Sequence, residues 1–83
     1  MYNISKKKIL TKGGYMNLGM ALRISLKNNK ISQSELGRKL GVSRGTINKH
    51  LHRWENGETP TLTTLKKWCS ELNEDYKKFL KYM

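Results

Sequence analysis

Four neighbouring residues, Arg44, Gly45, Asn48 and Lys49, are of types that can read the edges of nucleic-acid bases. Arginine and lysine donate to guanine O6 and N7, and an asparagine amide can pair with adenine N6 and N7. Their spacing places them on one side of a predicted helix, close to its start. Gly45 either lets a DNA backbone approach closely or is simply a small residue near a helix start. We interpret all four as candidate DNA base contacts.

The helix that positions these residues is predicted from its cap and its apolar stripe. Ser43 is a good N-cap, and Ile47, Leu51 and Trp54 recur at intervals of four and three residues. These three side chains form a buried face and leave the polar residues on the other side. Asn56-Gly57 is a stop signal for the helix.

A shorter helix is predicted immediately before the helix that begins after Ser43. Ser32 is a good N-cap, and Glu35 three residues later completes a capping box. Gly41 supplies the left-handed turn residue that other amino acids resist. Gly37 costs roughly 1 kcal/mol of helix propensity relative to alanine, so we expect another helix to cross closely there. Two short helices joined by a tight turn are the pattern of a helix-turn-helix.

Three further helices complete the predicted domain, and no segment predicts a strand. The first runs from about Asn17 to Asn28, the next opens at Pro60-Thr61, and Asn73 is expected to cap the last. The first helix packs through Leu18, Ala21, Leu22, Ser25 and Leu26, with Met20 and Ile24 as candidate additions. The fourth helix packs through Leu62, Leu65, either Trp68 or Cys69, and Leu72.

Size and charge narrow the class of protein. The chain has 83 residues, enough for one domain, and a formal net charge of +11. Residues 16–53 hold eight basic residues and a single acid, whereas residues 54–83 are balanced. A polyanion is therefore the natural partner of the middle segment. The single cysteine, Cys69, excludes an intramolecular disulfide and fits a reducing cytoplasm.

Residues 1–16 are interpreted as a flexible basic arm that precedes the helix-turn-helix domain of residues 17–83. The arm lacks helical periodicity and contains Gly13-Gly14. It either follows a DNA backbone or enters a minor groove, or it is a disordered tail. A separate hypothesis is that translation begins at Met16, so that residues 1–15 are not made.

The chain resembles the phage-repressor (Cro/CI, or XRE) class of helix-turn-helix domains from about Leu18 to Leu80. The matching segments, in consistent order, are Ile31-Ser32-Gln33, Leu40-Gly41-Val42-Ser43-Arg44, Ile47, Arg53-Trp54-Glu55-Asn56-Gly57 and Pro60-Thr61-Leu62-Thr63-Thr64-Leu65. The resemblance implies an all-α fold, a compact five-helix lambda-repressor-like bundle. It also implies that Gln33 contacts the DNA backbone.

One departure from the family pattern concerns the recognition helix. In the family, the Trp-Glu-Asn-Gly segment usually follows the isoleucine after a couple of residues, whereas Asn48 to Arg53 separate Ile47 from Trp54 here. The extra length is about four residues, close to one helical turn. We therefore predict a recognition helix one turn longer than usual.

Residues suited to phosphate form the candidate DNA backbone contacts. Hydroxyl groups and long cationic side chains position a protein on a duplex without specifying its sequence. Each of the three cationic residues could instead be a solvated charge, and Ser43 could act only as a cap. The candidates are Gln33, Ser43, Thr46, Arg53, Lys39 and Arg38.

The leading functional hypothesis is a sequence-specific regulator that binds double-stranded DNA, most simply a repressor of phage or mobile-element type. One alternative is an antitoxin or adaptor that acts mainly through a protein partner, and another is binding of RNA or single strands. Trp54, Trp68 and Tyr76 could be stacking platforms in that last case, but their helical spacing favours core packing. No catalytic dyad is evident, so we expect no enzyme.

Partners and location follow from the same hypothesis. We expect a cytoplasmic, nucleoid-associated homodimer without cofactor, metal, small-molecule ligand or membrane association. The i, i+2 spacing of His50 and His52 argues against metal ligation. The candidate dimer surface is the stripe Tyr76, Phe79, Leu80 and Met83, which could equally be core packing.

The predicted turn generates a first test. Replacing Gly41 by valine should destabilise the fold by about 1–2 kcal/mol, because a β-branched residue resists positive φ. Thermal unfolding measures the change, and an unaltered melting temperature would contradict the turn assignment.

Overall fold

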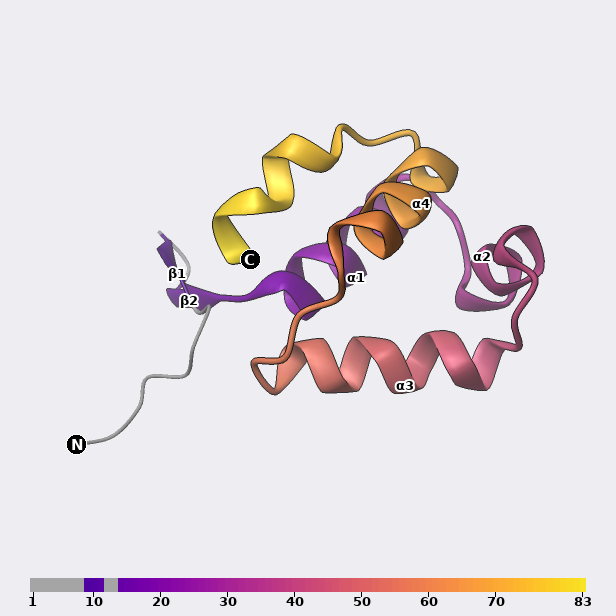
Figure 1. The fold of residues 1–83 in the computed structure, drawn as a ribbon, viewed down its shortest axis with the longest axis horizontal. Coiled ribbons are helices and arrows are strands. Elements are labelled where there is room, and N and C mark those ends of the chain that lie inside the picture. Colours follow the sequence, from indigo (N-terminus) through magenta and orange to yellow (C-terminus); the bar gives the residue numbers. More distant parts are fainter. Residues whose placement is uncertain (1–8, 12–13) are drawn as a thin grey trace.

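A computed structural model describes residues 9–11 and 14–83, with side chains from Met16 onward, and shows an all-helical domain with a short hairpin at its N-terminal side (Figure 1). The all-α, five-helix prediction is confirmed. The helices are α1 (Leu18–Asn28), α2 (Gln33–Leu40), α3 (Arg44–Glu55), α4 (Leu62–Leu72) and the 3₁₀ helix η1 (Tyr76–Tyr82).

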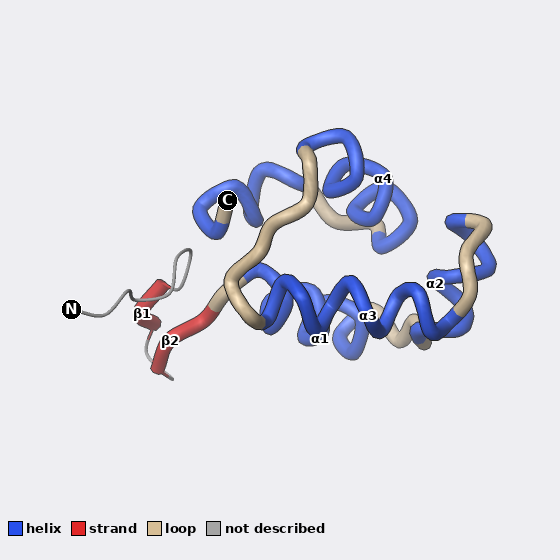
Figure 2. Tube along the Cα trace, turned by 60° about the horizontal axis from the view of Figure 1, so that its bottom comes forward, coloured by secondary structure: helices blue, strands red, loops and turns tan. Residues whose placement is uncertain are grey.

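The hairpin corrects the expectation that the chain has no strand. Strands β1 (Ile9–Thr11) and β2 (Gly14–Met16) pair antiparallel, with Ile9 opposite Met16, and lie beyond the start of α1 (Figure 2). Three-residue strands are too short to show the alternation by which a strand is predicted. Residues 9–11 and 14–16 of the segment predicted as a basic arm thus form a hairpin, and the remainder of that segment, residues 1–8 and 12–13, lies outside the described residues.

Side-chain N-caps begin the helices where the sequence predicted them. Ser32 Oγ accepts from the Glu35 amide at 3.0 Å, and Ser43 Oγ accepts from the Thr46 amide at 3.1 Å. Thr61 caps α4 in the same way. Each cap satisfies an amide that would otherwise lack a partner in the first helical turn. Gly41 ends α2 with φ of 77°, so the predicted left-handed turn is confirmed.

The boundary between α4 and η1 differs from the prediction. Asn73 ends α4 in the left-handed region, with φ of 59°, and does not begin the last helix. Asp75 takes that role, because its carboxylate accepts from the Lys77 amide at 3.0 Å. Asparagine is favoured at both N-caps and left-handed C-caps, so its presence does not tell the two ends apart.

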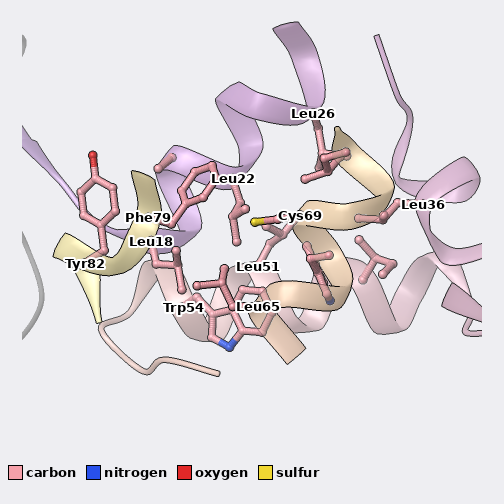
Figure 3. Close-up of a cluster of buried hydrophobic side chains, with 14 residues drawn as sticks. Leu18, Leu22, Leu26, Leu36, Leu51, Trp54, Leu65, Cys69, Phe79 and Tyr82 are labelled. Carbon is pink, nitrogen blue, oxygen red and sulfur yellow. The ribbon is translucent and has the colours of Figure 1, made fainter. Parts of the chain in front are cut away.

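One hydrophobic cluster joins all five helices (Figure 3). The predicted stripes of α1 and α3 are buried, but Ile24 is 48% exposed and does not widen the α1 face. On α4, Leu62 is also exposed, whereas Trp68 and Cys69 are both buried. Burial, with a smaller contribution from the carboxylates of Glu74 and Asp75, raises the pKa of the Cys69 thiol to about 11.

Close helix packing occurs at Gly19 rather than at Gly37. A Cβ at Gly19 would lie 2.5 Å from the Glu55 nitrogen, so α1 crosses α3 closely at this point. A Cβ at Gly37 would instead lie 2.6 Å from the Val42 carbonyl oxygen. The expectation of a crossing helix at Gly37 is thus wrong, because the turn backbone, folding back on α2, occupies that space.

A carboxylate network joins α1 to the segment before η1. Glu74 accepts hydrogen bonds from Ser25 Oγ at 2.7 Å, Asn29 Nδ2 at 2.9 Å and Lys78 Nζ at 2.8 Å. These donors, Lys78 first, lower the pKa of the Glu74 carboxyl to about 2. The charged form of Glu74 is therefore favoured by folding.

Two helical glycines should respond to alanine with opposite signs. Gly19→Ala should cost about 1–3 kcal/mol, because the added methyl meets backbone. Gly45→Ala, whose Cβ would lie 3.7 Å from Ser43 Oγ, should add about 0.5–1 kcal/mol through helix propensity. Urea unfolding of both variants measures the difference, and equal changes would refute the close approach at Gly19.

Glu74 should also make stability depend on acid. Its folded pKa of about 2 lies below the ordinary value of 4.5, so its stabilisation is complete above pH 4.5 and disappears as the pH falls toward 2. Glu74→Gln should lose about 2 kcal/mol at neutral pH and show a weaker loss of stability between pH 5 and 2. Ser25→Ala, which removes one donor, should show a smaller change. Chemical denaturation at a series of pH values measures both, and a wild-type acid dependence in Glu74→Gln would contradict the network.

Candidate nucleic-acid interface

Three of the four residues predicted to contact bases and one residue predicted to contact the DNA backbone line the same surface depression. Gln33, Arg44, Gly45 and Asn48 line this depression, which has a volume of about 240 Å³. Gln33 is the first residue of α2, and Arg44 and Gly45 are the first two of α3. Both helix N-termini therefore border it, and their dipoles add partial positive charge beside the Arg44 guanidinium. An anionic ligand is favoured here.

The exposed face of α3 extends beyond this depression. Arg44, Gly45, Lys49, His52 and Arg53 are exposed, whereas the apolar stripe on the other side of the helix is buried. α3 has twelve residues, so this face covers about three helical turns. Lys49 lies on the exposed face without lining the depression.

Asn48 has a contact that sequence reasoning missed. Its Oδ1 lies 3.5 Å from Nη2 of Arg23, a residue of α1. The Arg23 guanidinium also forms an ion pair with Glu55 through Nε and Oε2, and its Nη2 lies 3.3 Å from Oε1. The only signal in the sequence is a charged residue between the apolar positions of α1, which does not name its partners.

The candidate phosphate contacts differ in how free their side chains are. Ser43 Oγ and Thr46 Oγ1 lie 3.0 Å apart, so each hydroxyl already has a local partner. Arg53 donates to Glu58 Oε1 from Nη2 at 2.9 Å and from Nε at 3.1 Å. Arg38 is exposed. The two hydrogen bonds to Glu58 reduce the positive charge that Arg53 would present to a phosphate.

Lys39 lies away from the depression. It lines a groove between α2 and α4 together with Lys66 and Lys67, and this groove has a volume of about 560 Å³. Lys39 is six positions after Gln33, which places the two on different sides of α2. The structure therefore does not bring Lys39 together with the base-facing residues.

The aromatic residues favour the core-packing reading. Trp54 and Trp68 are buried, with ring centroids 4.7 Å apart, and His50 stacks on Trp54 at 5.4 Å. His52 Nδ1 lies 3.7 Å from Glu55 Oε1.

Among the described residues, no group of three His, Cys, Asp or Glu side chains is arranged to hold a metal ion. No described helix is long and apolar enough to cross a membrane.

The candidate dimer stripe is largely used inside the domain. Phe79 is 3% exposed, and Tyr76 and Met83 pack against the core, which leaves Leu80 as its exposed member at 41%. Phe79 is therefore a core residue of the domain, and Leu80 is the member of the stripe that is exposed to solvent.

Two helices joined by a left-handed glycine, with polar and basic residues exposed at the start of the second, define a helix-turn-helix DNA-binding domain. A helix-turn-helix family model matches residues 22–79, and the chain belongs to this family, of the Cro/CI (XRE) type. The family is one of DNA-binding transcription regulators and is not typically enzymatic. Neither a search of curated proteins nor a search of solved structures found a match.

Proposed function

We propose that this protein is a cytoplasmic, nucleoid-associated repressor of phage or mobile-element type that binds double-stranded DNA in a sequence-specific manner. It represses by covering a promoter, the simplest mechanism for one small DNA-binding domain. The observation that carries the proposal is the depression lined by Gln33, Arg44, Gly45 and Asn48. It combines groups suited to base edges with two helix N-termini suited to phosphate.

The proposed docking places the N-terminal part of α3 in the major groove. Arg44 and Lys49 are exposed and can donate to guanine O6 and N7. Gln33, at the N-terminal end of α2, approaches the phosphate backbone beside the groove. The backbone contact fixes the register of the protein, and the base contacts select the sequence.

A homodimer on a palindromic operator is part of this proposal. Two copies would read half-sites whose centres lie about 34 Å apart along the duplex. Because Phe79 is buried in the core, the interface would use the exposed side of η1, where Leu80 lies. Analytical ultracentrifugation with and without the selected duplex measures the stoichiometry.

Arg44→Ala is the most direct test of the proposed function. We expect binding to the selected site to weaken by about 1–3 kcal/mol, with a relaxed sequence preference, because a guanidinium that donates to a base is lost. The site is first obtained by selecting bound sequences from a random duplex library, and affinities are then measured at one fixed salt concentration. Lys67→Ala removes the same charge from an exposed position on α4 that does not line the depression, and it should have little effect on preference.

Two outcomes would contradict the proposal. One is a wild-type protein that selects no duplex motif, or that prefers RNA of equal length in competition. The other is an Arg44→Ala variant with unchanged affinity for the selected site, which would show that the N-terminal end of α3 is not where DNA is read.

A further inference from the structure

Arg23 reaches from α1 to two residues of the recognition helix. Its Nε donates a hydrogen bond to Glu55 Oε2. Its Nη2 lies 3.3 Å from Glu55 Oε1 and 3.5 Å from Asn48 Oδ1. The side chains of Arg23 and Glu55 are 33% and 23% exposed, so the ion pair is partly shielded from water. Such a pair resists displacement more than an exposed one does.

The chemistry of the guanidinium determines how the Asn48 amide is turned. A guanidinium has only donors, so the end of the amide that faces it must be the oxygen. The amide nitrogen is then left for the depression that Asn48 helps to line. A bidentate pair with adenine needs both ends of the amide directed at the same base edge. That arrangement conflicts with an oxygen directed at Arg23.

We propose that Arg23 is a positioning residue that makes Asn48 a hydrogen-bond donor to DNA, so that Asn48 selects a base-edge acceptor and not the adenine donor–acceptor pair. The acceptors available in the major groove are guanine N7 and O6, adenine N7 and thymine O4. This inference rests on the proposed function, and it replaces the adenine pairing expected for Asn48 from the sequence.

The surroundings of Glu55 hold Arg23 in place. The Glu55 carbonyl accepts from Asn17 Nδ2 at 2.7 Å, and the fully buried Asn17 side chain also caps α1. Gly19 lets the Glu55 backbone come into close contact with α1. Arg23 lies one helical turn after Gly19, on the same side of α1. The guanidinium is therefore directed along α3 from a rigid crossing point.

The spacing along α3 makes the double contact possible. Asn48 and Glu55 are seven residues apart, which is about two helical turns, so both side chains lie on the same side of the helix. A single guanidinium can then contact both. The segment between Ile47 and Trp54 supplies this separation, so the coupling depends on the length of this chain's recognition helix.

The experiment compares base preferences of four variants with that of the wild-type protein, by selection from a random duplex library. Asn48→Ala identifies the base pair that Asn48 reads, where discrimination should fall about 5- to 100-fold. Arg23→Met, which keeps length but has no donors, should relax preference at the same base pair. Asn48→Ala combined with Arg23→Met should lose no more than Asn48→Ala alone. Asn48→Asp has no donor and should lose the preference too.

Two controls separate positioning from stability. All measurements are made well below each variant's melting temperature, and Arg23→Lys, which keeps a donor, should retain part of the preference if positioning is the role. Duplexes carrying 7-deazapurines at the identified base pair remove the N7 acceptor. If the acceptor is a purine N7, wild-type protein should bind the modified duplex as weakly as Asn48→Ala binds the unmodified one. If the acceptor is thymine O4 or guanine O6, the affinity of wild-type protein should not change, and the amide donor is still required.

Several results would overturn the inference. Arg23→Met that weakens all duplexes equally, with preference retained, would show a structural role alone. Asn48→Asp with wild-type preference would exclude the donor role even if the arginine variants did not fold. Both results leave the proposed function intact, because wild-type protein would still select a motif. A wild-type protein that selects no motif would refute the proposed function and this inference together.

Discussion

The crossing of α1 and α3 at Glu55 is the contact on which the rest of the structure depends. Three parts of this one residue are engaged: its nitrogen lies beside Gly19, its carbonyl accepts from Asn17, and its carboxylate pairs with Arg23. Gly19 and Arg23 lie four residues apart on one face of α1, and Asn17 is the cap residue at the start of this helix. A glycine at the crossing removes the side chain that would hold the helices apart, and the loss of helix propensity is offset by closer packing.

The recognition helix is held at both ends by different kinds of interaction. At its C-terminal end the contacts are with α1, far away in the sequence. At its N-terminal end they are local, because Ser43 caps the helix and the turn at Gly41 packs its backbone against Gly37. Ile47 and Leu51 are fully buried between these ends. The exposed face of α3 is consequently held in one orientation, which a reader of base edges requires.

Among the described residues, two sets of basic side chains differ in their surroundings. Arg23, Arg53 and Lys78 have carboxylate partners within the chain. Arg44 and Lys49 are exposed on α3. The excess of positive charge in the middle of the chain thus divides into side chains held by carboxylates, of which Arg23 joins α1 to α3, and side chains presented to solvent. Arg44 and Lys49 give electrostatic attraction to a polyanion, whereas Arg23 helps to hold the orientation of α3.

The sequence by itself determined the caps, the left-handed turn and the buried stripe of α3, as well as the family. Ser32, Ser43 and Gly41 act on amides and backbone angles within a few residues, so their roles can be read from spacing alone. Only the tertiary structure decided that Gly19, not Gly37, marks the helix crossing, that Asn73 ends a helix, and that Arg23 contacts Asn48. The last pair is separated by 25 positions. Such contacts depend on how whole helices pack, and neither residue type nor local spacing contains that information.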